Sequence, residues 1–156
     1  RSTLFPYTTL FRSQLLEQTI ADANFEAQGA NKTAQLFCDG SIIINAHPEL
    51  LHSAVENIVR NALRYTAQGT TVEVKVSKAE SEVFIRILDY GPGVASDVLP
   101  HLFEPFYREA ADRSRASGNY GLGLAIAERA IVLHKGLISA QNVPAGGLLV
   151  EIRLPL

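Results

Sequence analysis

Two asparagines one helical turn apart, Asn57 and Asn61, are the first residues whose type and spacing suit chemistry. The surrounding stretch has helical periodicity, and Arg64 falls on the same edge of its apolar stripe. Asparagine suits a helix interior poorly because its amide competes for backbone hydrogen bonds. The two amide oxygens could ligate Mg²⁺, which prefers oxygen and bridges phosphates. Alternatively, the amides cap neighbouring turns or form a buried hydrogen-bonded pair.

A second candidate is the loop at residues 89–93, DYGPG, where an apolar strand ends at a carboxylate. The glycines would let a flat ligand approach, and Asp89 could then accept a hydrogen bond from an exocyclic amine. A plain turn capped by Asp89 explains the same residues. Taken alone, this loop is better explained as a plain turn than as a ligand site.

The third candidate is the glycine-rich segment 118–124, GNYGLGL, which leads into a helical pattern. A helix that starts there would present unpaired N–H groups and a positive dipole end to a phosphate. The segment is not a P-loop, because no Lys-Ser/Thr pair follows the glycines, and no strand precedes it as a dinucleotide fingerprint requires. A tight turn explains the glycines about as well.

The elements that must position these residues alternate between helices and strands. Helical periodicity predicts helices over residues 14–29, 48–66 and 123–135, and a short helix over 96–102. Strands are predicted over 34–38, 42–44, 71–77, 83–88, 137–140 and 148–154. The Asp39-Gly40 turn predicts a small hairpin between the first two strands. The interleaved order predicts a two-layer α/β sandwich.

Composition excludes several classes of protein. The 156 residues, 47% hydrophobic and 19% charged, suit one globular domain. A net charge of −2 gives no basis for binding nucleic acid. The single cysteine, Cys38, excludes an internal disulfide and a cysteine-based zinc site. No apolar run approaches the roughly 20 residues of a membrane span, so we expect a soluble domain without membrane contact.

The chain has no Met and begins with Arg1, so we expect it to be a fragment of a longer protein. Residues 1–13, RSTLFPYTTLFRS, look like a translated sequencing adapter. We expect this segment to be non-native and disordered, and exclude it from the domain at residues 14–156. An ordinary extended N-terminal segment is the alternative.

Four segments together resemble the ATP-binding catalytic domains of sensor histidine kinases. Residues 56–66, ENIVRNALRYT, resemble the N box of that family, and 89–93 its G1 box. Residues 103–108, FEPFYR, resemble the F box, and 118–124 the G2 box. The ordered set is far more specific than its parts. It implies an α+β Bergerat fold, with a mixed sheet of about five strands, about three covering helices and a mobile ATP lid.

The resemblance implies ATP and Mg²⁺ as cofactors and gives the N box a role. Asn61 would coordinate Mg²⁺ and Asn57 would support that site. Arg64 would reach the phosphates, as a catalytic residue, and Tyr65 would pack on the adenine.

The resemblance also assigns the loops. Asp89 would accept from the adenine amine, with Gly91 and Gly93 giving the ring access. Arg108, and with it Arg113, would stabilise charge on the transferring γ-phosphoryl group. The remaining cofactor-binding residues would cradle the phosphates; they are Gly118, Tyr120, Gly121, Leu122, Gly123 and Leu124.

Position 57 bears on the type of reaction. In the related gyrase and chaperone ATPases this position resembles a Glu that activates water, whereas an amide is a poor base. Glu56 lies one residue off and projects elsewhere, so phosphoryl transfer to a protein side chain is favoured over hydrolysis. The sequence departs from the family at Asn119, usually glycine, and at Tyr120, often threonine.

None of the four histidines, His47, His52, His101 and His134, has the acidic-leucine context of the family's acceptor. We therefore predict a catalytic domain that phosphorylates a histidine on a dimerisation domain outside this chain. An ATP hydrolase and a non-catalytic nucleotide sensor are the alternatives.

The resemblance further implies the partners of the full protein. These are the phosphoacceptor domain of its own chain and a response regulator. The full-length protein would be a homodimer in the inner membrane with this domain in the cytoplasm, and the fragment a monomer.

Overall fold

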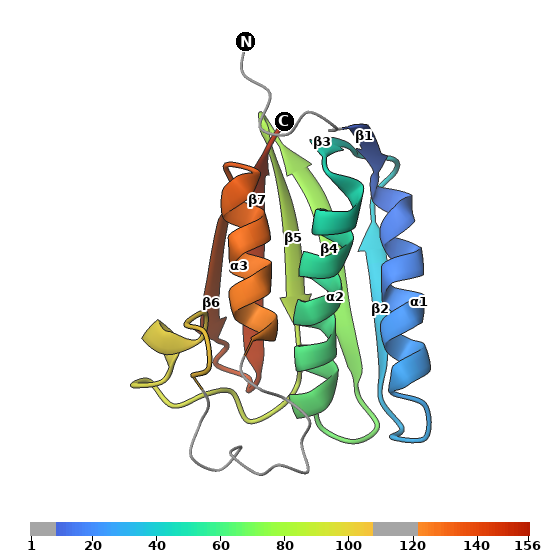
Figure 1. Ribbon diagram of the computed structural model, residues 1–156. Coiled ribbons are helices and arrows are strands. Elements are labelled where there is room, and N and C mark those ends of the chain that lie inside the picture. The colour runs from blue at the N-terminus through green and yellow to red at the C-terminus, as the bar shows by residue number, and fades with distance from the viewer. Residues whose placement is uncertain (1–8, 108–121) are drawn as a thin grey trace.

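The computed structural model describes residues 9–107 and 122–156 (Figure 1). Its helices are α1 (Leu16–Glu26), α2 (Pro48–Tyr65) and α3 (Gly123–Leu133), with short 3₁₀ helices η1 (Ser13–Leu15) and η2 (Leu99–His101). Its strands are β1 (Thr9–Arg12), β2 (Thr33–Cys38), β3 (Ile43–Ala46), β4 (Thr71–Ala79), β5 (Glu82–Leu88), β6 (Leu137–Asn142) and β7 (Leu148–Pro155). Among these helices, none has the length and apolar character needed to cross a membrane.

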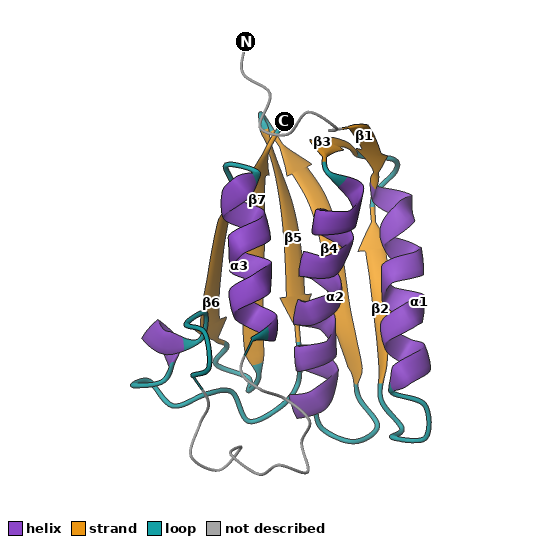
Figure 2. Ribbon diagram, viewed as in Figure 1, coloured by secondary structure: helices purple, strands orange, loops and turns teal. Residues whose placement is uncertain are grey.

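Five strands form one mixed sheet in the order β2-β4-β5-β7-β6. β2 runs parallel to β4, and the other neighbours pair antiparallel. All three α-helices cover the same face of this sheet (Figure 2). The predicted two-layer α+β architecture is therefore confirmed.

Helix α2 lies at the centre of the helical layer, between α1 and α3 (Figure 1). It begins at Pro48, whose missing N–H is tolerated at a helix start, and the preceding His47 Nδ1 accepts from Leu50 N–H at 3.4 Å. Its predicted apolar stripe is buried against the sheet, from Leu51 to Leu63. Full burial of one such aliphatic side chain stabilises a fold by about 1.5–3 kcal/mol, so α2 is fixed firmly in place.

The predicted hairpin at Asp39-Gly40 is wrong. The turn exists, and Gly40 has a φ of 73°, but the strands on its two sides join different sheets. β2 pairs in parallel with β4, whereas β3 pairs antiparallel with β1. Turn chemistry predicts that the chain reverses but does not choose the partner of each strand.

The expectation that residues 1–13 are disordered is wrong for residues 9–13. Backbone pairing joins β1 to β3, and Phe11 is buried in the core. Ser13 continues the contact, since its hydroxyl accepts from Ile42 N–H at 3.0 Å and its own N–H donates to Ile42 O at 2.8 Å. Strand pairing uses backbone groups, so a β-prone segment of any origin can fill this position. Residues 1–8 lie outside the described part, and the adapter origin stays a prediction.

The short helix predicted over 96–102 is only partly present. Its regular part is η2, and the residue that precedes η2 is Val98, which makes no side-chain capping hydrogen bond. The helix therefore does not begin at residue 96, and Ser96 does not cap it. Pro100 lacks an N–H, which limits the hydrogen bonds that a longer helix would need.

Candidate functional site

The asparagine pair of α2, the Asp89 loop and the helix that follows the glycine-rich segment all have one end of the molecule in common. In Figure 1 this is the lower end, where β5 and α2 finish and α3 begins. Because α2 and α3 pack side by side, the C-terminal half of α2 faces the start of α3. The residues on these three ends form the candidate site.

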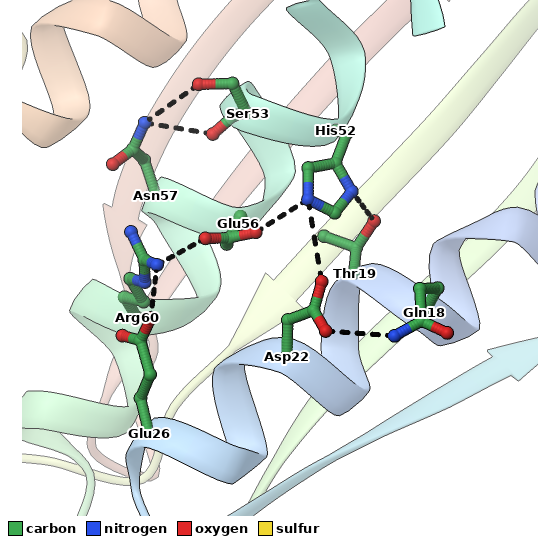
Figure 3. A network of polar contacts seen from close by, with 9 residues as sticks. All are labelled: Gln18, Thr19, Asp22, Glu26, His52, Ser53, Glu56, Asn57 and Arg60. Atoms are coloured by element: carbon green, nitrogen blue, oxygen red, sulfur yellow. Dashed lines mark hydrogen bonds and ion pairs between the residues drawn. The ribbon is translucent and has the colours of Figure 1, made fainter. Parts of the chain in front are cut away.

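The amides of α2 lie on the side of the helix that faces α3. Asn57 Nδ2 donates to Ser53 O at 2.9 Å and to Ser53 Oγ at 3.4 Å (Figure 3). Its oxygen faces Gly123, where an added Cβ would lie 3.4 Å from Oδ1. The structural alternative for Asn57, a hydrogen bond to a neighbouring turn, thus explains the position of the amide nitrogen. It does not explain the position of the amide oxygen.

Asn61 lies one turn further along α2 and is half-buried. Among the described residues, its amide has no hydrogen-bond partner, and it does not bond to Asn57. The Asn61 amide is also not among the described side-chain groups that are shut off from solvent without a partner, so it is accessible. Asn61 is therefore free to serve as a ligand.

Asp89 follows the end of β5 and is only 3% exposed. Its Oδ1 accepts from Gly91 N–H at 2.9 Å and from Leu148 N–H at 3.2 Å. Burial raises the pKa of Asp89 above its ordinary value, although the two backbone hydrogen bonds oppose this. Among the described residues Oδ2 has no partner, so it can accept from a ligand amine.

The loop that carries Asp89 is docked on the C-terminal end of α2. Tyr90 N–H donates to the hydroxyl of buried Thr66 at 2.9 Å, and Ala67 N–H donates to Tyr90 O at 3.3 Å. At Gly91 an added Cβ would overlap the carbonyl oxygen of Tyr65, so only glycine fits. Tyr65 is four residues, about 6 Å along the helix axis, beyond Asn61. Asp89 and Asn61 therefore lie on the same edge of the fold, close enough for one extended ligand.

A second contact holds the loop that carries Asp89, this time from the end of β6. Asn142, at the end of β6, accepts from Val94 N–H through Oδ1 at 2.9 Å and donates to Val94 O through Nδ2 at 2.6 Å. Gly93 has a φ of 73°, and an added Cβ there would lie 2.6 Å from Asn142 Oδ1. The side chain of Asn142 thus fixes the position of the loop that follows Asp89.

Sequence reasoning missed three residues of this site. Thr66 and Asn142 anchor the loop from distant elements, and at Gly147 a Cβ would overlap the backbone of Asp89. Gly146-Gly147 before a strand was a visible signal of close backbone approach. Nothing local marked Asn142.

The start of α3 supplies a helix N-terminus. Its N-cap, Leu122, makes no side-chain capping hydrogen bond, so the first N–H groups receive none from that residue. Together with the helix dipole, this end attracts an anion such as a phosphate. Gly123, beside Asn57, and Leu124 belong to this start.

Arg64 and Tyr65, at the end of α2, lie against each other, with the guanidinium 5.7 Å from the ring centroid. Lys32 Nζ donates to the Arg64 carbonyl oxygen at 3.1 Å, which secures the last turn of α2. The other predicted site residues lie outside the described part of the chain, and no outcome follows for them; they are Arg108, Arg113, Gly118, Tyr120 and Gly121.

The donors at this edge fit a magnesium ion carried by phosphates. Asn61 and Asn57 offer amide oxygens, and neither is a carboxylate. Mg²⁺ usually keeps several waters and takes few protein ligands when phosphates complete its shell. A site with one or two amide oxygens beside a phosphate-attracting helix start agrees with that chemistry.

Comparison with known proteins gives the same class of protein as the four sequence boxes. Residues 46–156 match a family model described as "Histidine kinase-, DNA gyrase B-, and HSP90-like ATPase". The chain belongs to this family.

Individual relatives show which members of this family the chain is similar to. The chain is 42% identical over 149 residues to the sensor histidine kinase CpxA of Escherichia coli K12, which covers 95% of this chain and 32% of CpxA. It is 44% identical over 108 residues to the signal transduction histidine-protein kinase AfsQ2 of Streptomyces coelicolor, which covers 69% of this chain and 20% of AfsQ2. The chain thus spans about a third of the length of CpxA.

Solved structures share the fold. The ATP-binding domain of PrrB from Mycobacterium tuberculosis superposes with a TM-score of 0.75 at 27% identity, over 95% of this chain and 96% of that one. The mycobacterial sensor histidine kinase MprB gives a TM-score of 0.82 at 21% identity, over 96% and 97%, and shows the fold alone. The chain has the ATP-binding catalytic domain of two-component sensor histidine kinases.

Proposed function

We propose that this domain binds Mg·ATP and transfers the γ-phosphoryl group to a histidine of a dimerisation domain in its own full-length protein. The phosphoryl group then passes to a response regulator. One observation carries the proposal: the loop of Asp89 is docked on the turn of α2 that follows Asn61. A base held by the carboxylate and a metal-bound phosphate tail held by the amide belong to one nucleotide.

Each end of the nucleotide has its own residues under this proposal. Asp89 Oδ2 accepts from the exocyclic amine of adenine, Gly91 and Gly93 admit the ring, and Tyr65 packs on it. Asn61 Oδ1 holds Mg²⁺, supported by Asn57. When bound, the ion neutralises phosphate charge.

The phosphates meet the start of α3 and the cationic side chains. The N–H groups at Leu122, Gly123 and Leu124 face the phosphate oxygens with the positive end of the helix dipole. Arg64 and Arg108 stabilise the charge of the γ-phosphoryl group in transfer. The other phosphate-binding residues of the proposal are Gly118, Tyr120 and Gly121.

The side chains near the phosphates favour transfer over hydrolysis. The bond from the γ-phosphorus to its bridging oxygen breaks, a bond to the acceptor imidazole nitrogen forms, and ADP leaves. Asn57 is an amide and cannot take a proton from water. Glu56 contacts the His52 ring and pairs with Arg60 on the side of α2 that faces α1, so it is turned away from the nucleotide (Figure 3).

A labelling experiment tests this function. With [γ-³²P]ATP the domain alone should stay unlabelled. When a separate dimerisation domain with its acceptor histidine is added, that domain should acquire an acid-labile, base-stable phosphate. An acceptor with its histidine replaced by alanine is the control.

Three outcomes would contradict the proposal. Stable label on a histidine of this chain would make it its own acceptor. Rapid phosphate release without an acceptor would identify a hydrolase of the gyrase or chaperone type. Binding of ATP with no transfer to a competent acceptor would identify a nucleotide sensor.

The relatives also suggest the setting. Because ATP is a cytoplasmic substrate, we place this domain on the cytoplasmic side of an inner-membrane sensor protein. Dimerisation would come from the acceptor domain, so the domain alone should be monomeric.

A further inference from the structure

A second cluster of ligating side chains lies between α1 and α2, on the side of α2 that faces away from α3 (Figure 3). Asp22 comes from α1, and His52 and Glu56 come from successive turns of α2. One donor atom from each residue lies within 4.8 Å of the other two. The nucleotide site uses none of these residues.

The geometry is close to that of a metal site with three protein ligands. His52 Nε2 lies 2.7 Å from Glu56 Oε2 and 3.8 Å from Asp22 Oδ2. Zinc binds imidazole nitrogen and carboxylate oxygen at about 2.0–2.2 Å. Small rotamer adjustments would therefore let one ion contact all three atoms.

The imidazole is already oriented for this role. Its Nδ1 lies 2.8 Å from the hydroxyl of Thr19, a residue of α1 that is fully buried. This contact fixes the ring and directs Nε2 toward the two carboxylates. Histidines that bind metals usually have their second nitrogen hydrogen-bonded in this way.

The charges around the cluster favour a cation. The cluster and its neighbours contain three carboxylates, Asp22, Glu26 and Glu56, but one guanidinium, that of Arg60, which pairs with the two glutamates. Negative charge is in excess among these groups whatever the charge of His52. The side chains of His52 and Asp22 are 37% and 45% exposed, so an ion can enter from solvent.

We propose that Asp22, His52 and Glu56 bind a divalent transition-metal ion, with Zn²⁺ as the representative, which ties α1 to α2. A nitrogen ligand with two carboxylates suits zinc-like ions better than Mg²⁺, which prefers oxygen alone. Solvent water would complete the coordination. The site does not depend on the proposed kinase activity, because its ligands lie on the other side of α2 from Asn57 and Asn61.

Thermal unfolding without nucleotide tests the proposal. ZnCl₂ at about a hundredfold excess over its dissociation constant should raise the unfolding midpoint by about 5 °C. Asp22→Asn and His52→Gln should each remove this shift. Asp22 is the safer variant, since its other hydrogen bond, from Gln18, is exposed and Asn can still accept it.

Two matched variants separate the site from unspecific zinc binding. His101 forms an exposed pair with Glu104 but is in no three-ligand group of the described residues, so His101→Ala should keep the shift. Cys38→Ser, which removes the thiol, should keep it too.

A second measurement reads the ligands directly. Co²⁺ should give a visible absorption band with the unmodified chain, and Asp22→Asn should lose it. A midpoint that zinc leaves unchanged, or a zinc shift that both Asp22→Asn and His52→Gln retain, would overturn the proposal. The Mg·ATP affinity of the Asp22 variant should match that of the unmodified chain, so the two sites can fail independently.

Discussion

The two sides of helix α2 differ in how their polar groups are satisfied. On the side that faces α1, His52, Glu56 and Arg60 all have partners, on α1 or along α2 (Figure 3). On the side that faces α3, Asn57 uses only its nitrogen and Asn61 has no partner among the described residues. One helix thus combines a side whose polar groups are already paired with a side whose amides remain available to a ligand.

This contrast indicates which residues of α2 serve a function and which serve the fold. Polar side chains that no other protein group pairs remain available to a ligand, whereas paired side chains are already engaged. Paired ions on a surface contribute little to binding or stability. Variants on the two sides of α2 should therefore affect different measurements.

Asn61→Ala should give the largest effect on nucleotide binding. We expect the Mg²⁺-dependent part of ATP affinity to disappear, a loss of about 10–100-fold or more. The unfolding midpoint should change little, because the described structure gives this amide no hydrogen bond to lose. Calorimetric titration with ATP, with and without Mg²⁺, measures the effect.

Arg60→Ala is the matched control on the other side of α2. It removes ion pairs to Glu26 and Glu56 and should leave ATP affinity within about twofold, since it is outside the site. An Asn61 variant with unchanged affinity would return that amide to a structural role.

Asp89→Asn should weaken ATP binding about 10–100-fold, with or without Mg²⁺, because hydrogen bonds to charged groups contribute about 1.5–3 kcal/mol. The same titrations measure it. A weakening seen only with Mg²⁺ would contradict the assignment of Asp89 to the base.

The Asp89 variant also gives a pH dependence of stability. Burial raises the pKa of Asp89 above its ordinary 3.8, so folding favours the protonated form. This contribution is fully present below pH 3.8 and is lost as the pH rises through the raised pKa of the folded state. Urea unfolding across this window should show the unmodified chain losing stability relative to Asp89→Asn, which is neutral throughout.

Asn142→Ala should have a smaller effect, about three- to tenfold on ATP affinity, through loss of the two hydrogen bonds to Val94. The loss should be equal with and without Mg²⁺, because the proposal places this loop against the base and not against the metal. Asn142→Asp should fall between, since a carboxylate accepts from Val94 N–H but cannot donate to its carbonyl. Equal affinities for all three proteins would remove Asn142 from the site.

Glu26→Gln should have the smallest effect. An exposed ion pair contributes about 0.2–1 kcal/mol, so the unfolding midpoint should fall by no more than about 3 °C. The difference should shrink in high salt. A fall in ATP affinity would mean that the two sides of α2 are coupled.

How far the sequence predicts this structure depends on whether the signal is local. The apolar stripe of α2 and the strand alternation predict the layers, which are confirmed. The order of the four boxes predicts the site residues on α2 and in the Asp89 loop, and their roles stay predictions. The pairing of β1 with β3, and the anchoring by Thr66 and Asn142, depend on contacts between distant segments. Such contacts leave no periodicity or spacing in the sequence, so they were missed or predicted wrongly.

A crystal structure of the domain with Mg²⁺ and a non-hydrolysable ATP analogue tests the central claim most directly. We predict one nucleotide with its exocyclic amine in hydrogen-bond contact with the Asp89 carboxylate. The same nucleotide should carry a Mg²⁺ ion about 2.0–2.1 Å from Asn61 Oδ1. A nucleotide bound elsewhere, or one that reaches only one of these two side chains, would contradict the account.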